Sequence, residues 1–270
     1  MRKLSLLSII QNDDQIIKEW IEHYIAEGVS HFYLVDDNST DNTREIIKDY
    51  KPYVTFASKS HSKVHNAQGS LINNLFINIA KEESEWVIFA MPNEYAYAKN
   101  RLCGIIDVFK KTDDKVEKIW IPSVYFGSND MDVQPKSITR NFTRRQELEG
   151  FVPGENGRVL CRTEHLVRIV DEGRNAVLSQ NDVFYLCNGQ RTSNFKFTHK
   201  AFSRLDITMN SYMMSKQYYE EKKKQQYGYG TTEFVNAMHR FINMQVSHNQ
   251  VVDTDLSSKL YAYNPDIYQT

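Results

Sequence analysis

Residues 4–43 read LSLLSIIQNDDQIIKEWIEHYIAEGVSHFYLVDDNSTDNT, and this segment carries the clearest structural pattern in the sequence. It opens with a short apolar run from Leu4 to Ile10, which is typical of a buried parallel strand. Apolar residues then recur at the spacing of one helix face from Ile16 to Ile25, and Gly28 supplies a C-terminal stop. A second β-prone run follows from His31 to Val35. The stretch therefore predicts a strand, a helix and a second strand.

The same alternation continues to about residue 100. It predicts helices over 43–50 and 67–81 and strands over 53–57 and 86–90. Alternating strands and helices are typical of an α/β fold with a doubly wound, mainly parallel sheet. Ligands of such sheets bind at the carboxyl ends of the strands. The polar residues expected at that edge are Asn12, Asp36, Asp37 and the loop Met91-Pro92-Asn93-Glu94.

The second half of the chain is less regular. The elements expected there are strands over 118–126, 137–142 and 158–162 and helices over 211–227 and 231–246. No internal repeat or low-complexity linker divides the sequence. We therefore expect a single domain over 1–270, with a nucleotide-binding half over 1–100 and a mixed acceptor half over 101–270.

Composition excludes several classes of function. Lys and Arg number 33 against 34 for Asp and Glu, so the net charge of -1 provides no global field for nucleic acid. No apolar run approaches the roughly 18–20 residues of a membrane span, and the N-terminus lacks a signal-peptide cleavage site. Three widely spaced cysteines argue against a disulfide framework or a zinc site. A soluble, cytoplasmic protein is expected.

The strand ends lack the common phosphate-binding motifs. No Gly-x-Gly-x-x-Gly follows the first strand, and no Walker-type phosphate loop occurs. Carboxylate and amide side chains stand there instead, and these groups suit a nucleobase and a ribose. The segment Asp36-Asp37-Asn38-Ser39-Thr40-Asp41 has a structural explanation as well, a turn followed by a helix cap. Spacing alone leaves both explanations open.

Residues 12–43 resemble the opening of the inverting glycosyltransferases of families 2 and 92. The residues that fit the family pattern are Asn12, Glu19, Trp20, His23, Gly28, Val29, Asp36, Ser39, Thr40 and Asp41. Later matches are Gln68 and Asn74, the strand over 86–89, the segment 125–128 and the basic segment 140–145. The resemblance implies a GT-A nucleotide-diphospho-sugar fold, a UDP-linked sugar donor and inverting transfer to a glycan hydroxyl. Donor contacts are expected from Asn12, Asp36, Asp37, Gln68, Asn74 and Asn93.

The sequence departs from the family at the metal site. Family members carry Asp-x-Asp after the central strand, because two carboxylates hold Mn²⁺ or Mg²⁺ against the diphosphate. This chain has Met91-Pro92-Asn93, which leaves Asn93 and Glu94 as weak metal ligands or none, and Ser211 replaces a family His. Three explanations stay open: a transferase with a basic clamp, a weak metal site, or a catalytically inactive relative that binds a nucleotide or glycan.

An inverting transfer also needs a carboxylate to take the proton of the acceptor hydroxyl. Asp182 and Glu155, in the acceptor half, are preferred to Glu94 for this role. A clamp on the diphosphate would use basic side chains in place of a cation. Its candidates are Arg140, Arg144, Arg145 and Lys216. Solvated strand and helix faces are the structural explanation for the same four residues.

Overall fold

The computed structural model describes residues 2–58, 67–109, 115–148, 157–170, 175–179, 183–187, 191–192 and 202–263. The chain forms two units, each described by itself below. The first comprises Met1–Ser123 with Val152–Met209, and the second comprises Val124–Phe151 with Asn210–Thr270. The expected single domain, with halves that meet near residue 100, stays a prediction.

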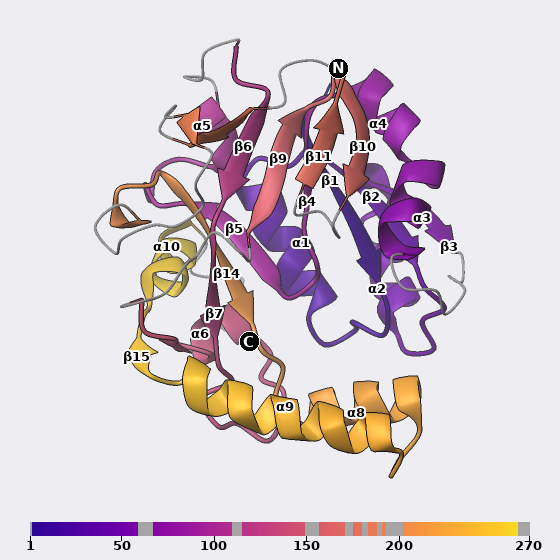
Figure 1. Cartoon of the computed structure of the whole chain (residues 1–270), viewed down its shortest axis with the longest axis vertical. Coiled ribbons are helices and arrows are strands. Elements are labelled where there is room, and N and C mark those ends of the chain that lie inside the picture. Colours follow the sequence, from indigo (N-terminus) through magenta and orange to yellow (C-terminus); the bar gives the residue numbers. More distant parts are fainter. Residues whose placement is uncertain are drawn as a thin grey trace. The chain divides into compact units, whose positions relative to one another are not determined.

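A mixed sheet forms the centre of the first unit (Figure 1). Its eight described strands lie in the order β13-β12-β6-β9-β4-β1-β2-β3. Their bounds are β1 Arg2–Ile10, β2 His31–Asp36, β3 Val54–Ser58, β4 Ser84–Phe89, β6 Lys118–Ile121, β9 Arg158–Arg162, β12 Phe184–Leu186 and β13 Arg191–Thr192. Strands β1 to β4 are parallel to their neighbours in this group, whereas β9 runs antiparallel to β4 and β6. The predicted parallel sheet over the first hundred residues is confirmed.

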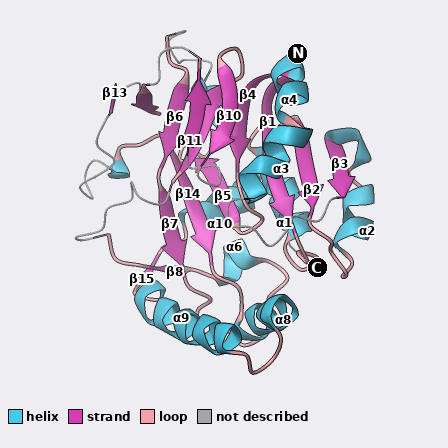
Figure 2. Cartoon of the chain, turned by 45° about the vertical axis from the view of Figure 1, so that its right-hand side comes forward, coloured by secondary structure: helices cyan, strands magenta, loops and turns pink. Residues whose placement is uncertain are grey.

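Helices cover both faces of this sheet (Figure 2). Their bounds are α1 Ile17–Ala26, α2 Thr43–Lys48, α3 Ala67–Leu75, α4 Ile77–Glu83 and α5 Ile105–Phe109. Phe32 of β2 packs on Trp20 of α1, with ring centroids 5.9 Å apart, whereas Tyr33 packs on Phe76 between α3 and α4. Because successive strand residues point to opposite faces, α1 and α3 lie on opposite sides. The doubly wound α/β class is confirmed.

Three elements of this unit differ from the sequence prediction. The helix expected over 67–81 is two helices, which meet at Phe76. The strand expected over 118–126 is divided at Pro122, because proline offers no N–H to a strand ladder. Strand β5, Glu94–Ala98, was not predicted and begins at the last residue of the expected loop 91–94. In the part of the chain that the structure describes, no helix is long and apolar enough to cross a membrane.

The second unit contains a smaller sheet and the C-terminal helices. Its strands lie in the order β15-β8-β7-β14, and β14 spans the boundary between the units. The bounds are β7 Ser123–Phe126, β8 Arg144–Arg145, β14 Ile207–Tyr212, β15 Val251–Val252, α6 Ile138–Asn141, α8 Lys216–Tyr227, α9 Thr232–His248 and α10 Asp255–Tyr263. The predicted helix over 231–246 is confirmed as α9, although Ile242 is 55% exposed.

Two predictions in this unit are wrong. The strand expected over 137–142 is the short helix α6, because the Ser137 side chain caps it by accepting from the Arg140 N–H. The helix expected from Ser211 begins only at Lys216, because β14 continues to Tyr212. Ser215 caps this helix in the same way, by accepting from the Tyr218 N–H.

The protein is expected to lose stability as the pH falls from about 6.5 towards 4. Burial, with a contribution from Arg2, lowers the pKa of His31 to about 4, and burial lowers the pKa of His248 to about 4. The unfolded chain binds these protons near pH 6.5, so acid favours unfolding. Urea titrations at pH 7.5 and 5 measure the change. Replacing His31 and His248 by glutamine should reduce the loss of stability between pH 7.5 and 5, whereas replacing the exposed His239 should not. A double variant that loses as much stability as the wild type would contradict this.

Candidate functional site

The strand order places a topological switch point between β1 and β4. From β1 the chain winds to β2 and β3 on one side, and β4 lies on the other side of β1. In open α/β sheets, ligands bind at the carboxyl ends of the strands beside such a point. Strands β1, β2 and β4 are parallel and end at Ile10, Asp36 and Phe89. The segments that follow these three residues form the candidate site.

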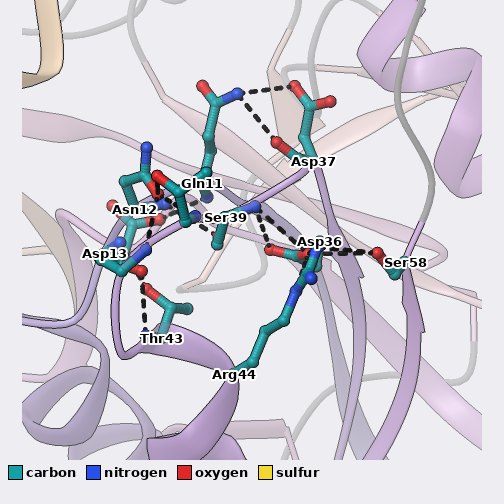
Figure 3. A network of polar contacts seen from close by, with 11 residues as sticks. Gln11, Asn12, Asp13, Asp36, Asp37, Ser39, Thr43, Arg44 and Ser58 are labelled. Atoms are coloured by element: carbon teal, nitrogen blue, oxygen red, sulfur yellow. Dashed lines mark hydrogen bonds and ion pairs between the residues drawn. The ribbon is translucent and has the colours of Figure 1, made fainter. Parts of the chain in front are cut away.

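The loops after β1 and β2 are tied together by side chains (Figure 3). Asn12, with φ of 51°, accepts from the Thr40 N–H at 2.7 Å and donates its own backbone N–H to Ser39 Oγ at 3.0 Å. The Gln11 amide donates to the Asp37 carbonyl at 2.9 Å and to its carboxylate at 3.3 Å. The two loops therefore present one surface of amide and carboxylate groups at the switch point.

Asp36 is fully buried and supports the loop that contains it. Its carboxylate accepts from the Ser39 N–H at 3.1 Å, from Arg44 Nε at 2.6 Å and from Ser58 Oγ at 3.3 Å. The turn that the sequence offered as a structural explanation is therefore present at Asp36. Asp37 is 4% exposed and lies beside Gln11, whose side-chain amide donates to it. Donor contacts by both carboxylates stay predictions.

A second group of contacts fixes the start of the helices behind these loops. The Asp13 N–H donates to Thr43 Oγ1 at 2.8 Å, which joins the β1 loop to the first residue of α2. The Asp14 N–H donates to the Asp41 carboxylate at 3.0 Å. Burial, followed by the nearby charge of Asp41, raises the pKa of Asp14. These contacts join the loop after β1 to the loop after β2 and to the start of α2.

Glu94, after the end of β4, forms a buried ion pair with Arg158. Arg158 Nε donates to Glu94 Oε2 at 2.8 Å and Nη2 donates to Oε1 at 2.7 Å. The two side chains are 9% and 10% exposed. The Met91 N–H also donates to Glu94 Oε2, at 2.9 Å. Both carboxylate oxygens are therefore engaged by the protein, which disfavours Glu94 as the base that takes the acceptor proton.

Helix α1 holds the strand that starts with Glu94. Trp20 Nε1 and the Tyr24 hydroxyl each donate to the Glu94 carbonyl at 3.0 Å. The Tyr24 hydroxyl also accepts from the Ala96 N–H at 3.0 Å, and a His23 ring nitrogen lies 2.7 Å from the Ala96 carbonyl. Burial raises the pKa of the Tyr24 hydroxyl, which keeps it protonated for donation. Two residues that carry the family resemblance, Trp20 and His23, therefore position the backbone of β5.

These residues do not fit a site for a divalent cation. The Glu94 carboxylate faces a guanidinium, and the Met91 thioether is a poor ligand for a hard cation. Across the described residues, no group of three or more His, Cys, Asp and Glu side chains could hold a metal ion. We therefore derive no step of a reaction through a metal. Weak binding of Mn²⁺ or Mg²⁺ by Asn93 and Glu94 stays a prediction.

The remaining donor and base candidates are only partly described. Asp182, Glu155 and the Gln68 side chain lie outside the described residues. Asn74 is exposed on α3. The neighbouring Asn73 instead pairs with both backbone groups of Ile169 in β10 (Leu166–Val170), at 2.7 and 2.9 Å. This amide joins α3 to the hairpin of β10 with β11 (Asn175–Leu178).

The four clamp candidates belong to the second unit. Arg145 is paired with Asp253 at 2.6 Å and donates to the Gln146 carbonyl at 2.8 Å. Arg144 and Lys216 are exposed, and Arg140 is partly buried in α6. Their action on a diphosphate stays a prediction.

Sequence reasoning missed Arg158, Gln11 and Arg44. The sequence could have indicated Arg158, because it is a charged residue at the start of the predicted strand Arg-Val-Leu-Cys-Arg and follows Gly157. Gln11 had no such signal, since it acts through a contact with Asp37, 26 residues away. Arg44 lies eight residues after Asp36, and their pairing depends on how the loop between them folds.

The chain is similar to known glycosyltransferases. The model of glycosyltransferase family 92 matches residues 7–169. No curated protein matches the chain. Among solved structures, S. aureus TarS 1–349 in complex with UDP has 14% identity and a TM-score of 0.43, covering 91% of this chain and 72% of that chain. Glucosyl-3-phosphoglycerate synthase from Mycobacterium tuberculosis, with Mn²⁺, UDP and glucosyl-3-phosphoglycerate, has 15% identity and a TM-score of 0.35, covering 61% and 58%.

Proposed function

This chain belongs to glycosyltransferase family 92, and from that premise we propose that it transfers a sugar from a nucleotide donor to a hydroxyl of a glycan. Its α/β sheet is that of a GT-A glycosyltransferase fold. The proposed donor is UDP-linked, as the family resemblance implies, and the proposed transfer inverts the configuration of the sugar carbon.

The observation that carries this proposal is the joined surface of Gln11, Asn12 and Asp37 at the switch point. Its amides both donate and accept hydrogen bonds, and its carboxylate accepts them. A uracil edge and ribose hydroxyls offer the complementary groups. A glycine-rich loop that would cradle phosphate is missing from the sequence at this point. The surface therefore suits the nucleoside end of a donor.

The chemical step needs a base and a stabilised leaving group. A carboxylate must take the proton of the acceptor hydroxyl on the face opposite the diphosphate. We propose Asp182 or Glu155 for this role, since Glu94 is paired with Arg158. The leaving diphosphate gains negative charge in the transition state, so fixed positive groups near it would lower the barrier.

A second candidate function is a catalytically inactive relative that binds a nucleotide or glycan. The ion pair of Glu94 with Arg158 favours it, because this pair directly follows Met91 and Asn93, which replace the family's metal-binding carboxylates. Calorimetric titration with a panel of nucleotides and nucleotide sugars, with and without Mn²⁺, tests binding. An assay for release of the nucleotide then separates the two functions. Binding and turnover in the presence of a chelator support the metal-independent transferase; binding without turnover supports the inactive relative.

Replacing Asp37 by alanine is expected to weaken UDP binding at least tenfold, about 1.4 kcal/mol, because it removes a carboxylate from the nucleoside surface. The melting temperature should change little, since the backbone contact from Asp37 N–H to the Ile10 carbonyl remains. Calorimetry measures the affinity. Replacing the exposed Asp49, at the C-terminal end of α2, is the control. Unchanged UDP affinity in a folded Asp37→Ala protein would remove Asp37 from the site.

A further inference from the structure

Arg158 of β9 lies at the switch point, beside the end of β4. Ile88 stands opposite Leu160 in the antiparallel register, so Ala90, two residues further on, stands opposite Arg158. Ala90 is the first residue after β4, and its N–H donates to the Leu7 carbonyl of β1 at 3.3 Å. The Arg158 side chain is 9% exposed. A buried cation therefore stands at the edge of the sheet where the donor site is proposed.

Glu94 engages one edge of this guanidinium and leaves part of it available. Nε and Nη2 donate to the carboxylate, whereas Nη1 makes no hydrogen bond within the described part of the chain. A guanidinium stays charged at any working pH and offers five N–H groups in one plane. Its free edge can donate to a phosphate while the other edge stays paired. The pair with Glu94 thus orients the guanidinium and leaves some of its N–H groups able to donate to a ligand.

The backbone that carries Arg158 is tightly placed against β6. A Cβ added to Gly157 would lie 2.3 Å from the Ile121 carbonyl oxygen and 2.5 Å from the Trp120 ring. Only glycine tolerates this approach. Ile121 stands opposite Arg158 in the β6 register. Both Gly157 and Glu94 therefore limit where the guanidinium can be.

We infer that Arg158 binds the diphosphate of the donor and supplies there the positive charge that a metal ion supplies in relatives with paired carboxylates. This inference rests on the proposed function and extends it. Strand β9 is three strands from β2, about 14 Å at the usual strand spacing. A nucleotide that lies across the strand ends would place its nucleoside against Asp37 and its diphosphate against Arg158. The phosphate oxygens accept hydrogen bonds from the free guanidinium edge, and no covalent step involves Arg158.

Calorimetry with UDP and with uridine, both in the presence of EDTA, tests the inference. The wild type should bind UDP at least tenfold more tightly than uridine. Arg158→Met should lose at least tenfold in UDP affinity with uridine affinity unchanged. Because loss of one partner of a buried pair can unfold a protein, the double variant Glu94→Met with Arg158→Met is measured too; similar apolar pairs often preserve stability. Arg162→Met, on the same strand beside Trp86, is the matched control and should keep the preference for UDP.

The outcomes separate this inference from the proposed function. Selective loss of UDP affinity in a folded Arg158 variant supports it. Equal losses for UDP and uridine, or no loss, overturn it and leave the proposed donor site intact. A preference for UDP that appears only with Mn²⁺ also overturns it, because a metal would then hold the diphosphate. A wild type that binds neither compound overturns the proposed function and the inference together.

Discussion

Replacing Glu94 by alanine is expected to lower the free energy of unfolding by about 3–5 kcal/mol, because Arg158 would stay buried without its partner. The change also removes the acceptor of the Met91 N–H, so the loop after β4 loses its anchor. Urea unfolding followed by circular dichroism measures the loss. Glu94→Gln, which keeps an acceptor for Arg158, should be less destabilising.

A surface pair between the neighbouring strands β1 and β4 is the control for this experiment. Glu85 pairs with Lys3 at 2.6 Å, but the Lys3 side chain is 63% exposed. Exposed pairs contribute about 0–1 kcal/mol, so Glu85→Ala should be nearly neutral. If Glu94→Ala were as stable as Glu85→Ala, the buried pair would not hold this part of the unit together.

Replacing Trp20 by alanine is expected to destabilise the protein by about 3–5 kcal/mol, because it opens a large cavity under β5. Trp20 is fully buried, packs on Tyr24 and Phe32 with ring centroids 5.3 and 5.9 Å away, and donates to the Glu94 carbonyl. Urea unfolding measures the effect. Trp20→Phe, which keeps an aromatic ring but loses the N–H contact and part of the indole volume, should cost about 1–3 kcal/mol. An alanine variant as stable as the phenylalanine variant would show that the cavity term is small.

The periodicity of the first hundred residues was enough to predict the sheet. Buried strands such as Leu4–Ile10 read as short apolar runs, and α1 keeps its apolar residues on one face, so both signals are local. Strand β5 was not predicted because side chains of α1 hold its backbone, and a local sequence pattern does not contain such contacts. The short helix α6 was predicted as a strand for a different reason. The Ser137 side chain caps this segment, and the cap favours a helix over a strand.

The resemblance indicated a candidate site, but the roles of its residues depend on tertiary contacts. Adjacent carboxylates at 36 and 37 look equivalent in the sequence, yet Arg44 pairs with Asp36, whereas Gln11 contacts Asp37. Likewise, the sequence suggested that Glu94 is a metal ligand or the catalytic base. Its partner Arg158 becomes visible only when β9 is placed antiparallel to β4. Register between strands distant in the chain is information that a single sequence does not carry.

Hydrogen exchange with and without saturating UDP shows whether the donor nucleotide binds at the carboxyl ends of β1, β2 and β4. We expect slower amide exchange in residues 10–13, 36–41 and 90–94 when UDP is bound, because these segments form the candidate site. Unchanged exchange in all three segments with UDP bound, or protection confined to other segments, would contradict it.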